Sequence, residues 1–83
     1  MKIQLLYFAR LRERFGCGSE TLECSASTVA DVLEILRARG GAFAEELAVD
    51  RVFRVALGQQ IARADSVLTD GIEMAIFPPV TGG

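Results

Sequence analysis

The amino-acid sequence predicts a two-layer α+β domain, in which one main helix packs on one face of a sheet. Three observations lead to this prediction. One amphipathic helix is clear, several short segments alternate apolar and polar residues as strands do, and the composition is 51% hydrophobic and 24% charged, as in globular domains. With 83 residues, we expect one domain, spanning residues 1–83, with a small core.

Alternating hydrophobicity predicts the strands. In residues 2–9, Ile3, Leu5 and Tyr7 share one face, which we expect to face the core because Lys2 and Gln4 mark the other face. Further strands are expected at residues 20–24, 53–57, 60–62 and 72–77, with turns at residues 58–59 and 70–71.

The main helix is predicted at residues 29–39. Its apolar stripe consists of Val29, Val32, Leu33 and Leu36. Thr28 and Asp31 have the spacing of a capping box, with Asp in place of the usual Glu, and Gly40 and Gly41 are expected to end the helix.

Two shorter helical pieces are predicted at residues 10–15 and 42–48. In the second piece, Glu45 and Glu46 are expected to face solvent. The arginines of the first piece are interpreted as a solvated helix face rather than a site for an acidic partner; they are Arg10, Arg12 and Arg14.

The second face of the sheet has no long helix to cover it. Alternation places four apolar side chains there, namely Leu6, Phe8, Ala56 and Phe77. An apolar strip of this kind indicates a partner site. Cover by loops or by the short helical pieces is the alternative.

Composition excludes several classes of function. A net charge of −2 and a pI near 5.0 argue against nucleic acid as the main ligand. Because histidine is absent, no Ser–His or Cys–His pair and no histidine-ligated metal site can form within the chain, and no metal site is predicted. Cys17 and Cys24 lack CxxC spacing and are interpreted as buried thiols rather than a disulfide.

The expected location is the cytoplasm. No secretory signal is seen, and the cysteine usage fits a reducing compartment. No apolar run approaches the roughly 20 residues needed to cross a bilayer, so no membrane association is predicted.

The C-terminal segment, residues 78–83, is predicted to be a flexible tail. Two terminal glycines let backbone enter a channel too narrow for any Cβ atom, which would bring the terminal carboxylate into a partner's active site. A carboxylate with a pKa of about 3.5 is an anion and a poor electrophile at neutral pH, so it must first be activated. The chain contains no phosphate-binding motif, so activation would need another protein. An ordinary frayed terminus is the alternative.

At this point the sequence resembles a known family. The resemblance is carried by YFARLRE at residues 7–13, VL at 32–33 with LRAR at 36–39, LTDG at 68–71 and, most specifically, FPPVTGG at 77–83. In these runs the chain resembles the small subunit of molybdopterin synthase, the MoaD family of ubiquitin-like sulfur carriers. The resemblance implies a β-grasp fold, with a mixed sheet of about five strands on one main helix.

The resemblance also implies a chemistry for the tail. An activating enzyme of the MoeB type would adenylate the Gly83 carboxylate, using ATP and magnesium, and a persulfide donor would then convert it to a thiocarboxylate. Gly82, Thr81, Val80 and Pro79 would thread the tail into partner active sites. On a large subunit of the MoaE type, Gly83 would deliver sulfur to cyclic pyranopterin monophosphate and build the molybdopterin dithiolene.

By the same resemblance, the chain would bind no cofactor and would not be an enzyme alone. The large subunit would supply pterin binding and acid–base groups in a heterotetramer. The partner-binding residues implied are Phe8, Ile61 and Phe77. Gly58 and Ile72 depart from the Asn and Asp often found there, which affects turns rather than the tail.

Two other functions stay open. The first is sulfur carriage for another pathway, such as thiazole synthesis or tRNA thiolation. The second is covalent protein modification through an amide between Gly83 and a lysine.

Overall fold

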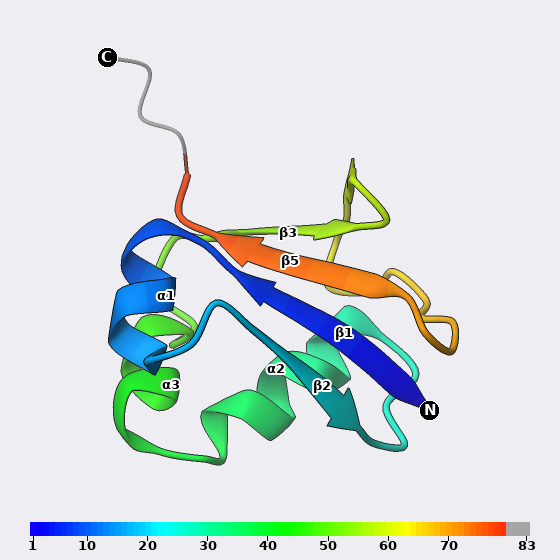
Figure 1. Ribbon diagram of the computed structural model, residues 1–83, viewed down its shortest axis with the longest axis horizontal. Helices are drawn as coiled ribbons and strands as arrows, with labels where there is room; N and C mark the ends of the chain where they lie inside the picture. The colour runs from blue at the N-terminus through cyan, green and yellow to red at the C-terminus, as the bar shows by residue number, and fades with distance from the viewer. Residues whose placement is uncertain (80–83) are drawn as a thin grey trace.

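The computed structural model describes residues 1–79, which form eight helices and strands (Figure 1). The strands are β1 (Lys2–Tyr7), β2 (Ser19–Glu23), β3 (Arg54–Leu57), β4 (Gln60–Ile61) and β5 (Glu73–Phe77). The helices are α1 (Ala9–Phe15), α2 (Val29–Arg37) and α3 (Gly41–Glu46). Every element predicted from the sequence is present, with ends that shift by one or two residues.

The five strands form one mixed sheet in the order β2-β1-β5-β3-β4. The central strands β1 and β5 are parallel, whereas β2 is antiparallel to β1 and β3 is antiparallel to both β5 and β4. Because β1 and β5 are parallel, both strands end at the same edge of the sheet. The predicted sheet of about five strands is therefore confirmed.

The core lies between the sheet and α2. Ile3, Leu5 and Tyr7 are fully or almost fully buried, as their alternation in β1 predicts. The predicted stripe of α2 is also buried, as are Met74 and Ile76 of β5. Each such side chain contributes roughly 1.5–3 kcal/mol through burial.

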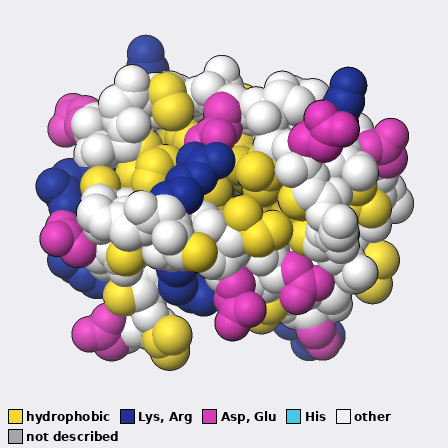
Figure 2. Space-filling view, turned by 90° about the horizontal axis from the view of Figure 1, so that it is seen from below, with side chains coloured by type: hydrophobic (Ala, Val, Ile, Leu, Met, Phe, Trp, Pro, Cys, Tyr) yellow, Lys and Arg dark blue, Asp and Glu magenta, His cyan; other side chains and the backbone are white. Residues whose placement is uncertain are grey.

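All three helices lie on one side of the sheet (Figure 1). On that side, partly buried hydrophobic side chains such as Leu22, Ile35 and Phe43 pack against the core, and hydrophobic side chains gather at the centre of the face seen from below (Figure 2). The opposite face of the sheet has no helix over it among residues 1–79.

The capping box of α2 is confirmed. The Thr28 hydroxyl accepts from the Asp31 amide at 3.4 Å, and the Asp31 carboxylate accepts from the amides of Ser27 and Thr28 at 3.0 and 3.1 Å. These backbone bonds lower the pKa of Asp31. The helix ends at Arg37, two residues before the predicted end, because the chain tightens there into i→i−3 bonds that lead to Gly40, whose φ is 78°.

The prediction that Glu46 faces solvent is wrong. Only 5% of this side chain is exposed, because α3 packs beside α1 and turns Glu46 toward it. The Glu46 carboxylate accepts from Arg10 at 2.8 and 3.1 Å and from Arg14 at 3.1 Å. Arg10 and Arg14, two of the three arginines expected to form a solvated helix face, therefore hold α3 against α1.

Cys17 and Cys24 are free thiols in this structure, and both are half-buried rather than fully buried as expected.

Candidate functional site

The candidate site is the outer face of the sheet, which we define as the face turned away from α2. Strand register places four apolar residues side by side across it: Leu6 pairs with Ala75, Ala75 with Ala56, and Ala56 with Ile61. This outer row crosses the sheet from β1 to β4. Leu6 and Ala56 of this row belong to the uncovered apolar strip expected from alternation, and Ala75 and Ile61 join them.

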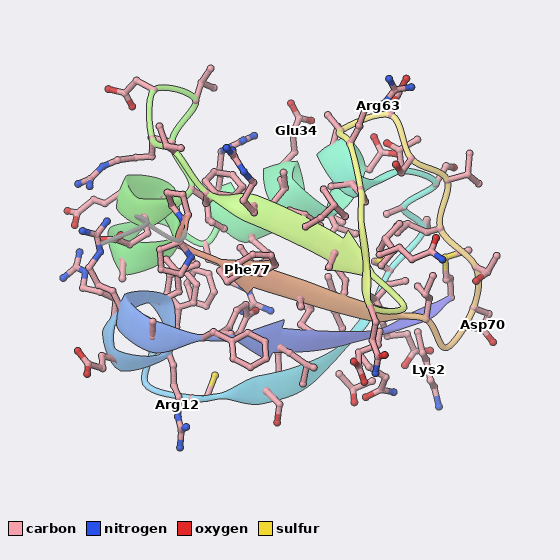
Figure 3. The ribbon with its side chains drawn as sticks, turned by 90° about the horizontal axis from the view of Figure 1, so that it is seen from above. Lys2, Arg12, Glu34, Arg63, Asp70 and Phe77 are labelled. Atoms are coloured by element: carbon pink, nitrogen blue, oxygen red, sulfur yellow. The ribbon has the colours of Figure 1, made fainter. Side chains whose placement is uncertain are left out.

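Two aromatic residues lie beyond the row, where β1 and β5 end together. Phe77 is the last residue of β5, and its label in Figure 3 lies on the sheet as seen from above. Phe8 directly follows β1 in extended conformation, and its amide donates to the Ile76 carbonyl at 3.3 Å. Phe8 therefore lies beside Phe77, at the base of the C-terminal segment that starts with Pro78.

The outer face is apolar and largely accessible. Phe8 is 48% exposed and Ile61 69% exposed, while Leu6, Ala75 and Phe77 are half-buried. The expectation that Ala56 contributes an exposed side chain is wrong, because this small side chain lies between Ala75 and Ile61 and is only 9% exposed. Phe8 and Phe77 point outward as alternation predicts; their partner-binding role stays a prediction.

The chain after Phe8 is held firmly. Ala9 has a left-handed backbone (φ 52°), which turns the chain directly from β1 into α1. Arg10 and Arg14 then bind the buried Glu46. Burial alone would raise the pKa of Glu46, but the hydrogen bonds and charge of Arg10, with Arg14, outweigh it and lower that pKa. The chain next to the aromatic end of the outer face is thus tied to α3 by hydrogen bonds.

Pro79 is the last of the predicted tail residues that the structure describes, and it is half-buried. Proline has no amide hydrogen, so Pro78 and Pro79 cannot extend the β5 ladder as donors. The predicted reactive Gly83 and the threading residues Gly82, Thr81 and Val80 lie outside the described residues.

Chemically, the described part of the outer face offers apolar contact area rather than reactive groups. Its side chains are the apolar ones above, flanked by Gln4, Arg54 and Glu73. Within residues 1–79, no cluster of three or more Cys, Asp or Glu side chains could hold a metal ion. No helix in this part of the chain is long and apolar enough to cross a membrane.

Reasoning from the residues alone did not place Ile61, and it left Ala75 out of the apolar strip although alternation with Met74 and Ile76 puts Ala75 on the outer face. The turn that precedes Ile61 could have placed this residue. Gly58 and Gln59 both have positive φ, 53° and 73°, as a two-residue type I′ hairpin turn requires, and this turn fixes Ile61 opposite Ala56.

Known proteins match this chain over nearly its full length. The sequence model of the ThiS family matches residues 5–83. Molybdopterin synthase sulfur carrier subunits of Haemophilus influenzae and of Escherichia coli are each 36% identical to this chain over 81 residues, which cover 98% of this chain and 99% of the relative. The crystal structure of SAMP1 from Haloferax volcanii superposes with a TM-score of 0.81 at 26% identity, covering all of both chains.

These findings confirm the β-grasp fold and the resemblance on which it was expected. The chain belongs to the ThiS family and, within it, is related over nearly its full length to the molybdopterin synthase sulfur carrier subunits.

Proposed function

We propose that this chain is the sulfur carrier subunit of a molybdopterin synthase. The observation that carries the proposal is the 36% identity to sulfur carrier subunits over 98% of the chain. The family match also runs through Gly83, the residue to which the proposal gives the chemistry.

The proposed chemistry takes place on the backbone of Gly83. The Gly83 carboxylate attacks the α-phosphorus of ATP on a MoeB-like activating enzyme, which uses magnesium, and pyrophosphate leaves. A persulfide sulfur then displaces AMP from the acyl carbon, and a thiol cleaves the remaining S–S bond. The product is a thiocarboxylate, which stays anionic at neutral pH and is a better nucleophile than the carboxylate.

Delivery of the sulfur requires a second partner. We propose that the outer face docks on a MoaE-like large subunit through Phe8, Ile61 and Phe77. The tail, with Pro79, Val80, Thr81 and Gly82, would then carry Gly83 to cyclic pyranopterin monophosphate. The complex would be a heterotetramer of two small and two large subunits, and its acid–base groups would belong to the large subunit.

The geometry of the described residues supports this arrangement. The exposed Phe8 and the half-buried Phe77 lie at the edge from which the terminal segment departs. A subunit bound to these side chains would therefore hold the start of the tail at its own surface. The parallel pairing of β1 with β5 brings them together.

Intact-mass measurement of the protein isolated from its native cells tests the proposal. We expect a fraction of the chains to be heavier by the exchange of one oxygen for one sulfur, and this fraction to vanish when Gly82 is replaced by leucine, because a side chain there blocks entry to the activating enzyme. The Gly82→Leu variant should unfold at the same temperature as the wild type.

Three results would count against the proposal. Normal sulfuration of Gly82→Leu would show that a side chain at position 82 does not block entry of the tail into the activating enzyme. High-mass conjugates without a sulfur-bearing form would indicate a protein modifier. Sulfuration without loss of molybdoenzyme activity in a deletion strain would indicate a carrier for another pathway.

A further inference from the structure

A second surface of the molecule lies on the helix side of the sheet. A groove of about 430 Å³ runs between α2 and the β3–β4 edge. Val29 and Leu33 of α2 line one wall, and Val55 and Ala62 line the other. Since Val55 faces inward whereas Ala56 belongs to the outer row, this groove and the outer face lie on opposite sides of the sheet.

Several apolar side chains that line the groove remain exposed to solvent in the folded chain. Val49 and Val52, on the segment between α3 and β3, are 89% and 66% exposed, and both line the groove. Phe53 beside them is half-buried. Apolar side chains left in water around a concave surface are typical of a binding site.

The rim of the groove is basic. Four of the nine Lys and Arg residues of the chain line it, although the net charge of the whole chain is −2, and the lining contains no Asp or Glu. The four are Arg37, Arg51, Arg54 and Arg63. Arg54 alternates with the inward Val55 and pairs with Phe77, so its side chain lies on the outer face and adds no charge to the groove.

The four arginines differ in how they are bound. Arg37 donates to the Leu47 carbonyl, and Arg63 lies 3.5 Å from Asp65 in an exposed pair. Within residues 1–79, neither Arg51 nor Arg54 forms an ion pair, and both are exposed. Asp50, the acidic neighbour of Arg51 in sequence, is not part of the lining.

We propose that this groove binds an extended segment of a partner protein in which acidic side chains alternate with apolar ones. The apolar side chains would pack against Val52 and Val55, and the carboxylates would meet the guanidinium groups of Arg51 and Arg63. Arginine suits this task because its planar group binds a carboxylate through two parallel hydrogen bonds. Electrostatic complementarity of this kind selects the partner and speeds its association.

The shape of the site favours a peptide over other anions. The lining is mostly apolar, and its arginines come from separate segments, α2 and the chain on either side of the β3–β4 hairpin, rather than from a single turn of backbone as in many phosphate sites. The site also differs from the outer face in position and in chemistry, so the inference does not depend on the sulfur-carrier function. A segment could occupy the groove while a second protein covers the outer face.

Titration of the 15N-labelled full chain with a synthetic peptide tests the proposal. The probe alternates Val and Leu with Asp and Glu and has blocked ends. We expect the amide signals of residues 48–55 and 62–64 to shift, those of β1 to stay, and the affinity to fall as salt is raised. A peptide with the same apolar residues and Lys in place of every acid should not bind.

Charge reversal supplies the second measurement. We expect the double variant Arg51→Glu/Arg63→Glu to bind the acidic peptide about tenfold more weakly. The matched control is Lys2→Glu/Arg12→Glu, which changes the net charge equally; the two control residues lie away from Arg63 in Figure 3. If the first variant unfolds, Arg51→Gln/Arg63→Gln replaces it, with a smaller loss expected.

Four results would overturn the proposal: no shifts at millimolar peptide, shifts confined to the outer face, equal binding of the lysine peptide, or equal loss in the control variant. Binding to phosphatidylglycerol vesicles without binding to the peptide would also overturn it, because the occupant would then be a membrane.

Discussion

Individual side chains on the sheet either stabilise the fold or remain available to a partner. Tyr7 belongs to the first kind: it is 1% exposed, and its hydroxyl donates to Glu20 at 2.6 Å. Burial and this hydrogen bond raise the pKa of Tyr7, so it stays a neutral donor. Phe77, one position beyond the partner of Tyr7 in β5, points to the outer face and is only half-buried.

Replacing Phe77 by alanine should therefore weaken partner binding more than folding. We expect the affinity for the large subunit to fall at least tenfold, because aromatic anchors at an interface often contribute about 2 kcal/mol or more. The free energy of unfolding should fall by only about 1–2 kcal/mol, below the 3–5 kcal/mol typical of a fully buried phenylalanine. Calorimetry with the large subunit and urea unfolding give the two values.

The control for this prediction is Val67→Ala. Val67 is 73% exposed and follows the β4 segment, outside the outer row, so neither quantity should change much. If Phe77→Ala unfolds easily while the surviving folded fraction binds normally, Phe77 is a packing residue and the docking surface must be placed elsewhere.

Among the elements, the β3–β4 hairpin has a residue in an unfavourable conformation. Gln59 has a φ of 73°, which glycine adopts freely and glutamine does not. Replacing Gln59 by glycine should raise the free energy of unfolding by about 0.5–1 kcal/mol, because the strain exceeds the added freedom of the unfolded chain. A higher urea midpoint with an unchanged slope would show this.

The matched control lies one residue further along. Gln60→Gly introduces the same residue into strand β4, where φ is not positive, and should destabilise the protein by about 0.5–1 kcal/mol. Equal destabilisation by both variants would mean that the turn does not constrain Gln59.

Elements encoded by neighbouring residues could be predicted from the sequence. The alternation of Ile3, Leu5 and Tyr7, the Thr28–Asp31 capping box and the turn at residues 58–59 each depend on neighbours a few positions away. They form as expected because the physical cause of each is contained in the segment itself.

Features that depend on distant segments could not be predicted. The burial of Glu46 requires Arg10 and Arg14 from a helix more than thirty residues earlier. The basic groove requires the register of the β3–β4 edge against α2, which no single segment contains. The outer row could be predicted only in part, because alternation identifies the face of a strand but not the residues of neighbouring strands that lie side by side on it.

Across the whole molecule, buried or bonded carboxylates link segments far apart in the chain. Glu20 of β2 accepts two hydrogen bonds from Arg39, beyond the end of α2, each at 2.8 Å. The Arg39 bond, aided by Tyr7, lowers the pKa of Glu20. Glu46 links α3 to α1 in the same way, also with a lowered pKa. Both links need the ionised carboxylate.

The sign of the pH dependence follows from these lowered pKa values. In the unfolded chain a glutamate titrates near 4.5, and in the folded protein Glu20 and Glu46 titrate lower. Their contribution to stability is therefore fully present above pH 4.5 and is lost as the pH falls through the folded values. We expect the free energy of unfolding to be level near neutral pH and to decline below about pH 4.5.

Replacement of Glu46 by glutamine isolates one of these links. At pH 7 the variant should be less stable by about 1–3 kcal/mol, because the three charge-assisted hydrogen bonds from Arg10 and Arg14 are weakened or lost while both arginines are partly solvated. Its stability should also depend less on pH between 3 and 5, since the carboxylate that titrates there has gone. Glu45→Gln is the control: Glu45 also contacts Arg14 but is 64% exposed, so its loss should change the unfolding free energy little. A Glu46→Gln curve parallel to the wild-type curve at every pH would show that acid sensitivity arises from other carboxylates, Glu20 first among them.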